Sequence, residues 1–147
     1  MDPTQLKAWY RRYVDDVFNA RNLDAADHYW RPTFTNHYGP PEVPPGAAGV
    51  KQTLRAWFVA FPDAHITVED VVVDGNQLVA RLCIEGTHAG EFLGVPATGV
   101  FLKLREIAWY QLDGTQMTDI WPVLWDLPNV FHQVQDAALR ALQAHSG

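Results

Sequence analysis

Residues Glu85 to Gly99 read Glu-Gly-Thr-His-Ala-Gly-Glu-Phe-Leu-Gly-Val-Pro-Ala-Thr-Gly, and this stretch decides the fold. It follows a segment with apolar residues at every second position, the pattern of a half-buried strand: Leu78, Ala80, Leu82 and Ile84. His88 continues the same phase at the end of that strand. The glycines and the proline that follow favour a loop that returns into another strand over residues 100–111.

The apolar residues on either side of this stretch predict the remaining elements. Three-and-four spacing predicts helices over residues 4–20 and 50–61, with a short helix after Asn22 between them. Four prolines make residues 39–49 a loop. Extended segments are predicted over residues 34–38, 66–74, 78–88, 100–111 and 115–125. A closing helix is predicted over residues 127–145.

Helices followed by four long antiparallel strands predict an α+β fold, in one domain spanning residues 1–147. The alternation changes phase near Glu69-Asp70, which predicts a β-bulge that bends the sheet. We therefore expect a curved antiparallel sheet wrapped around the N-terminal helices, forming a cone with an internal pocket. The six Trp, five Tyr and seven Phe residues can fill a core and also suit a cavity for a flat organic ligand.

Charge and composition limit the expected partners and compartment. The net charge is -6 and the 11 Lys and Arg residues form no basic run, so nucleic acid is not an expected partner. No apolar run approaches the ~20 residues of a membrane span, and residues 1–4 carry neither a basic nor a hydrophobic segment. Cys83 is the single cysteine, so no internal disulfide can form. We expect a cytoplasmic protein that does not associate with membranes.

The residue inventory also argues against several kinds of catalytic site. The only serine is Ser146, so a serine nucleophile elbow is absent. The six histidines show no metal-ligand spacing, and no Gly-x-x-x-x-Gly-Lys loop is present to bind phosphate. We therefore expect neither a metal nor a cofactor.

Several motifs, taken together, point to a family. They are Phe61-Pro62-Asp63, Gly86-Thr87-His88-Ala89-Gly90-Glu91-Phe92, Gly94-Val95-Pro96-Ala97-Thr98-Gly99, and the stretch from Asp119-Ile120-Trp121 to Asp126 with Gln133 after it. Over nearly its whole length the chain resembles the SnoaL-like polyketide cyclases of the nuclear transport factor 2-like superfamily. The resemblance implies an intramolecular aldol condensation of a polyketide without metal or Schiff base. It also implies an acidic residue at the pocket and donors that hold the enolate oxygen.

Two carboxylates are candidates for the implied acid. Asp126 matches the family's acidic position, and its alternative role is to cap the final helix. Asp119 shares strand parity with Met117 and Trp121 and could point inward with them; its alternative is an exposed strand carboxylate. Inside an aromatic cavity, desolvation raises the pKa of an aspartate from its usual value of about 3.9, so that it can take and return a proton near neutral pH.

The spacing between Trp121 and Asp126 departs from the family pattern. The segment 121–126 is about one residue longer than usual and contains Pro122, so we expect a bulge there. The bulge leaves open which of Asp119 and Asp126 faces the pocket.

Other residues could assist the acid or bind the substrate. His88 matches the family's Thr-His-x-Gly and could donate to the substrate carbonyl, or it could be a rim histidine bonded to backbone. Candidates to line or gate the cavity, each with core packing or a turn role as the alternative, are His37, Trp9, Tyr13, Trp57, Phe61 and Trp121. The loops 39–49 and 91–98 are candidate lids.

Three functions remain open. The first is a SnoaL-like cyclisation of a small hydrophobic carbonyl compound. The second is another enzyme on the same frame, either an epoxide hydrolase of the limonene type, using Arg81 or Arg105, or a ketosteroid-isomerase-like proton shuttle. The third is a non-catalytic binding or dimerisation domain. A buried carboxylate beside a hydrogen-bond donor would separate the enzymes from the binder. A homodimer is expected in each case, because such cones often pair through an open sheet face.

Overall fold

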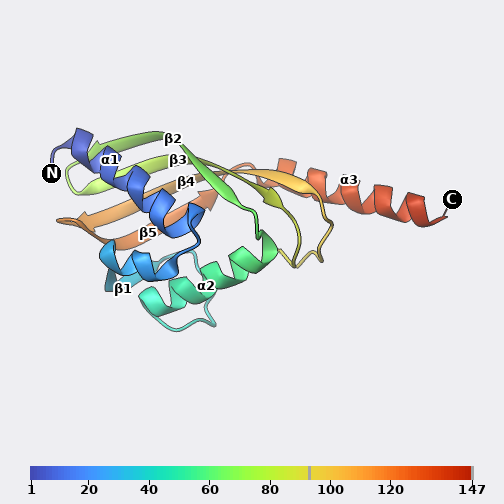
Figure 1. Cartoon of the computed structure of the whole chain (residues 1–147), viewed down its shortest axis with the longest axis horizontal. Coiled ribbons are helices and arrows are strands. Elements are labelled where there is room, and N and C mark those ends of the chain that lie inside the picture. The colour runs from blue at the N-terminus through green and yellow to red at the C-terminus, as the bar shows by residue number, and fades with distance from the viewer. Residues whose placement is uncertain (93, 147) are drawn as a thin grey trace.

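Within residues 1–92 and 94–146, which the computed structural model describes, five strands form one curved, unclosed sheet (Figure 1). In spatial order the strands are β1 (Trp30–Asn36), β5 (Gln116–Leu124), β4 (Phe101–Asp113), β3 (Gln77–Thr87) and β2 (His65–Asp74). The helical elements are α1 (Pro3–Tyr13), η1 (Val14–Asn19), η2 (Leu23–His28), α2 (Ala47–Ala60) and α3 (Leu127–Ser146). The predicted α+β class is confirmed.

The sheet is antiparallel from β2 to β5, and β1 adds a parallel edge. Two tight turns join β2 to β3 and β4 to β5, with Gly75 and Gly114 at positive φ. β1 pairs with β5 in the parallel sense and only briefly, because its register shifts between Trp30 and Thr35. Sequence alone predicted an extended segment there without a partner.

The N-terminal helix buries its aromatic face against the sheet. A capping box starts α1: the Asp2 carboxylate accepts from the Gln5 backbone N–H at 2.8 Å, and the Gln5 side chain accepts from the Asp2 N–H at 2.9 Å. The buried residues of α1 are Leu6, Trp9, Tyr10 and Tyr13. The helix predicted over residues 4–20 is present, but it changes to π-helical geometry at Val14.

The proline-rich loop packs tightly onto the start of α2. A Cβ at Gly49 would lie 1.8 Å from the Pro44 carbonyl oxygen, so only glycine permits this approach. The loop therefore holds α2 in a fixed position beside β1.

Two bulges shape the sheet. The β2 register shifts between Val68 and Asp70, where the sequence predicted a bulge. On β5 the shift lies at Thr118, because Gln111 pairs with Asp119 while Leu112 pairs with Met117.

The bulge expected within residues 121–126 is absent, and this expectation was wrong. Pairing runs unbroken from Gln111 to Glu106 and includes Pro122 opposite Ala108. The Trp125 N–H donates to the Arg105 carbonyl, so by alternation the Pro122 nitrogen points away from β4. On that side Pro122 lies beyond the last residue pair between β1 and β5, so the missing N–H interrupts no hydrogen bond of the sheet.

The C-terminal helix extends away from the rest of the molecule (Figure 1). Val130, Val134 and Ala137 are buried, and α3 contacts β4. The apolar side of α3 is only partly covered, because Phe131 and Leu142 remain exposed. No helix in the described residues is both long and apolar enough to cross a bilayer.

Candidate active site

A cavity of about 360 Å³ lies between the helices and the inner face of the sheet. α1, α2 and all five strands contribute to its wall, which is mostly apolar and aromatic. Representative wall residues are Trp30, Phe34, Trp57, Phe92, Ile120 and Leu124. The cavity lies inside the curve of the sheet, where the sequence predicted a pocket, and its size suits a small organic molecule.

Glu106 is the one carboxylate in this wall among the described residues. It lies on β4 between the buried residues Leu104 and Ala108 of the same face. Within the described part of the chain its carboxyl makes no hydrogen bond or ion pair. Burial raises its pKa from 4.5 to about 7. Glu106 can therefore exist in both protonation states near neutral pH.

Glu106 is not among the site residues predicted from the sequence, although a signal for it exists. Residues at even positions of β4 face inward and are otherwise apolar or aromatic: Leu102, Leu104, Ala108, Tyr110 and Leu112. Glu106 interrupts that series as its single charged member. The exposed residues between them, Lys103 and Trp109, have mixed character and obscured the alternation.

Three buried tyrosines, Tyr10, Tyr13 and Tyr110, belong to the wall of the same cavity as Glu106. The Tyr10 and Tyr110 hydroxyl oxygens lie 3.3 Å apart, and the Trp30 Nε1–H donates to the Tyr13 hydroxyl at 3.1 Å. Burial raises the pKa of Tyr10, Tyr13 and Tyr110 well above its usual value, and the nearby Glu106 charge adds to the shift. All three phenols are therefore neutral hydrogen-bond donors at physiological pH.

His88 is fully buried in a layer behind the cavity wall. Its ring lies 5.8 Å from that of Phe61 and 6.4 Å from that of Phe92, which does line the cavity. Nδ1 lies 2.9 Å from the Thr98 hydroxyl, while Nε2 has no hydrogen-bond partner among the described residues. The inward phase predicted for His88 is confirmed, and Nε2 is a buried polar atom next to the site.

Asp126 lies outside the cavity, at the start of α3. Its carboxylate accepts hydrogen bonds from Arg105 at 3.3 Å and from the Asn129 side chain at 3.4 Å. Its carbonyl oxygen accepts the first helical bond, from the Val130 N–H. Residue 105 faces the opposite side of β4 from Glu106, so Asp126 is held on that outer side.

Asp119 also faces outward, because the Thr118 bulge separates it from Met117. Met117 is buried in the core, whereas Trp121 contributes to a groove on the outer face. Asp119 therefore shares a face with Trp121 but not with Met117, and the expectation that it points inward with both residues was wrong. After the bulge, the residues that point into the cavity are Ile120, Pro122 and Leu124.

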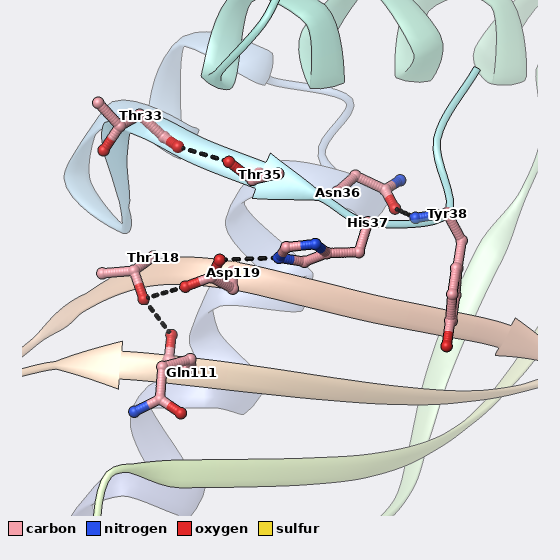
Figure 2. A network of polar contacts seen from close by, with 8 residues as sticks. All are labelled: Thr33, Thr35, Asn36, His37, Tyr38, Gln111, Thr118 and Asp119. Carbon is pink, nitrogen blue, oxygen red and sulfur yellow. Dashed lines mark hydrogen bonds and ion pairs between the residues drawn. The ribbon is translucent and has the colours of Figure 1, made fainter. Parts of the chain in front are cut away.

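On the outer side Asp119 joins a polar network with His37, which follows β1, and with Thr118 of β5, whose hydroxyl also contacts the Gln111 carbonyl of β4 (Figure 2). His37 Nε2 lies 2.8 Å from one Asp119 oxygen, and the Thr118 hydroxyl donates to the other at 2.7 Å. These hydrogen bonds, that of His37 first, hold the pKa of Asp119 below its usual value. The His37 ring stacks on Trp121 with centroids 4.5 Å apart. His37, Asp119 and Trp121 thus come together, but outside the cavity.

The other predicted binding residues divide between the wall and the layer behind it. Tyr13 and Trp57 line the cavity. Phe61 packs behind Trp57, with ring centroids 4.5 Å apart, and Trp9 packs on Tyr29 at 5.5 Å. In the described chain no three His, Cys, Asp or Glu side chains cluster as metal ligands would.

Comparisons with known proteins agree with this architecture. TsrD from Streptomyces laurentii superposes with a TM-score of 0.81 at 24% identity, over 91% of this chain and 97% of TsrD. A proposed polyketide cyclase from Acidithiobacillus ferrooxidans gives 0.79 at 26% identity, over 93% and 99%. A SnoaL-like polyketide cyclase from Agrobacterium tumefaciens gives 0.72 at 24% identity, over 83% and 92%.

No match was found among curated proteins. The family profile described as SnoaL-like polyketide cyclase matches residues 8–134. That match includes the cavity, Glu106 and the three tyrosines. The chain belongs to the SnoaL-like polyketide cyclase family.

Proposed function

We propose that this protein is a cofactor-independent acid–base enzyme of the polyketide cyclase type. Its substrate is a small hydrophobic carbonyl compound that undergoes intramolecular aldol condensation or a related cyclisation in the aromatic cavity. The observation that carries the proposal is the unpaired Glu106 carboxyl in the cavity wall. Family membership supports the general kind of reaction.

The chemistry needs one group that first removes and then returns a proton. The Glu106 carboxylate takes a proton from the carbon beside a carbonyl, which leaves an enolate. The enolate carbon bonds to a second carbonyl carbon of the same molecule, and the resulting alkoxide takes the proton back from Glu106. A pKa of about 7 suits both steps, because neither protonation state is scarce near neutral pH.

A proton shuttle of the ketosteroid-isomerase kind is the second candidate. It is favoured by the same observation, since Glu106 shares the cavity with three tyrosine donors. An epoxide hydrolase of the limonene type has less support. Arg81 is exposed on the outer side of the sheet, and Arg105 pairs there with Asp126.

Proton abstraction can be tested without the natural substrate. We expect the protein to accelerate deuterium incorporation into the α-position of 2-tetralone in D₂O, followed by NMR. Glu106→Gln should reduce the accelerated rate by at least ~100-fold, the usual contribution of a general base. Glu85→Gln is the matched control, because Glu85 lies on the outer face beside Lys103.

Two further variants decide between the carboxylates. Asp126→Asn and Asp119→Asn should leave the exchange rate within about twofold of the wild type. If either aspartate variant loses the rate and Glu106→Gln keeps it, the base has been misassigned. If the wild-type protein binds 2-tetralone but does not accelerate exchange, the cavity is a binding site without catalysis.

A further inference from the structure

Glu106 is the charged residue of the described cavity wall, and part of its surface remains accessible. It is half-buried on the inner face of β4, whereas Leu104 and Ala108 on either side of it are buried. The residues paired with it on the adjacent strands, Leu82 and Leu124, line the same cavity. The accessible part of Glu106 therefore faces the cavity, where a ligand can reach the carboxyl.

The described wall offers this carboxylate no countercharge. No Lys, Arg or His side chain belongs to it, and the neighbouring Arg105 faces the outer side of the sheet, where it pairs with Asp126. An ionised carboxyl with little water around it and no partner is unfavourable, which is the cause of the raised pKa of Glu106. A cation carried by a ligand would relieve this penalty, whereas a permanently anionic ligand would add to it.

The aromatic part of the wall also suits a cation. The rings of Trp57 and Phe92 are half-buried and meet edge-on, with centroids 5.6 Å apart. The face of an aromatic ring attracts an alkylammonium group, and that of indole does so most strongly. Tyr38 is 64% exposed and belongs both to the cavity wall and to the groove on the outer face, so the cavity opens to solvent beside it. A charged ligand therefore has a way into the cavity.

Beyond the proposed reaction, we propose that the cavity binds small aromatic amines as cations, with Glu106 as their counter-ion. Such an amine donates its N–H to the Glu106 carboxylate and places its ring against the aromatic wall. It occupies the space of the carbonyl substrate and engages the base, so it also inhibits proton abstraction. Binding of this kind requires the cavity and the Glu106 carboxylate, but no catalytic step.

Three ligands of the same shape and different charge test this site without turnover. At pH 8 N,N-dimethylbenzylamine is a cation, isobutylbenzene is its uncharged carbon analogue, and phenylacetate is an anion of similar size. Affinities of wild type and Glu106→Gln are measured by NMR titration. The substitution should weaken the amine by at least about tenfold, leave isobutylbenzene within about twofold and strengthen phenylacetate, because it removes a negative charge and little else.

The pH dependence of binding to the wild type is a second test that needs no variant. The other titratable groups of the described wall are phenols, which stay neutral between pH 6 and 8: Tyr10 and Tyr13 of α1, Tyr38 after β1, and Tyr110 of β4. Glu106 changes from mainly protonated to mainly ionised over this range. The affinity of the amine should therefore rise about tenfold from pH 6 to pH 8, while that of isobutylbenzene should not rise.

Glu85→Gln is the matched control, because it removes the same charge from the outer face beside Lys103. It should change none of the three affinities by more than about twofold. Equal effects of the Glu85 and Glu106 changes, or an amine affinity that does not depend on pH, would overturn the cation site.

Deuterium exchange into 2-tetralone separates the two proposals. Glu106-dependent amine binding without any exchange supports the cation site and removes the proposed base. Glu106-dependent exchange that N,N-dimethylbenzylamine does not inhibit leaves the base in place and overturns the cation site.

Discussion

At the scale of single residues, Glu106 is costly to the fold that holds it. A carboxyl without a hydrogen bond in an aromatic wall lacks the hydration that would stabilise its ionised form, which is why its pKa rises to about 7. Replacing it with a neutral side chain should stabilise the protein. Residues retained at such a cost are commonly functional.

The pH dependence of stability follows from that shift. Between pH 4.5 and about 7 the unfolded chain releases the Glu106 proton while the folded chain retains it, so rising pH favours unfolding. Glu106→Gln removes this penalty. It should raise the free energy of unfolding by up to about 3 kcal/mol above pH 7 and by almost nothing near pH 4. Urea denaturation of both proteins at pH 4, 6 and 8 measures the difference. A pH-independent difference would mean that Glu106 does not titrate in the cavity.

The residues of the site differ in how far sequence could identify them. His88, Tyr13 and Trp57 were candidates, because strand phase and helical spacing placed them on inward faces. Glu106 was not, since an isolated glutamate in a strand is normally exposed and nothing in its neighbours marks a cavity. Its chemistry arises from burial, which depends on how the elements of the cavity wall pack around it.

At the scale of elements, the Thr118 bulge decides which side of β5 faces the cavity. The Glu69-Asp70 bulge could be predicted because valines on both sides of it change phase. Around Thr118 the inward residues Met117 and Ile120 differ in phase, but the outward Trp121 shares the parity of Met117 and hides the insertion in the sequence. Pro122 suggested a bulge at the wrong place, since a proline on the free side of a strand needs none.

Asp119 should therefore act on the stability of the sheet edge and not on catalysis. Its contacts with His37 and Thr118 connect the end of β1 to β5. The lowered pKa means that this stabilisation is present above the unfolded value of 3.8 and is lost as pH falls through the folded value. Asp119→Asn should cost about 0.5–1 kcal/mol at pH 7, measured by urea denaturation, with tetralone exchange unchanged.

The matched variant is Asp136→Asn, on the exposed surface of α3, which should change stability by less. The wild type and the Asp119→Asn variant should become equally stable at low pH, where the Asp119 carboxyl of the wild type is protonated. A lost exchange rate at unchanged stability would instead assign Asp119 to catalysis.

At the scale of the whole molecule, the motifs allowed the family and the curved α+β fold to be predicted, because they mark where strands end and the chain returns. Which side chains enter the cavity depended on one inserted residue and on helix packing, which no motif reports. The same sheet also has a second face. On that side, outward residues of four neighbouring strands form a continuous apolar row: Val72, Val79, Trp109 and Trp121.

We propose that this outer row is the surface of a homodimer. Trp109 is 47% exposed and Val72 is 59% exposed, although they lie at the centre and edge of the row. Ile107 and Val123 pair with each other beside them on the same face, and contiguous exposed apolar side chains of this kind are typical of protein interfaces. Analytical ultracentrifugation should show twice the 16.6 kDa chain mass for the wild type and a monomer for Trp109→Glu. Because Trp109 faces away from the cavity, Trp109→Glu should still catalyse tetralone exchange. A wild-type monomer at micromolar concentration would show that the row is simply exposed.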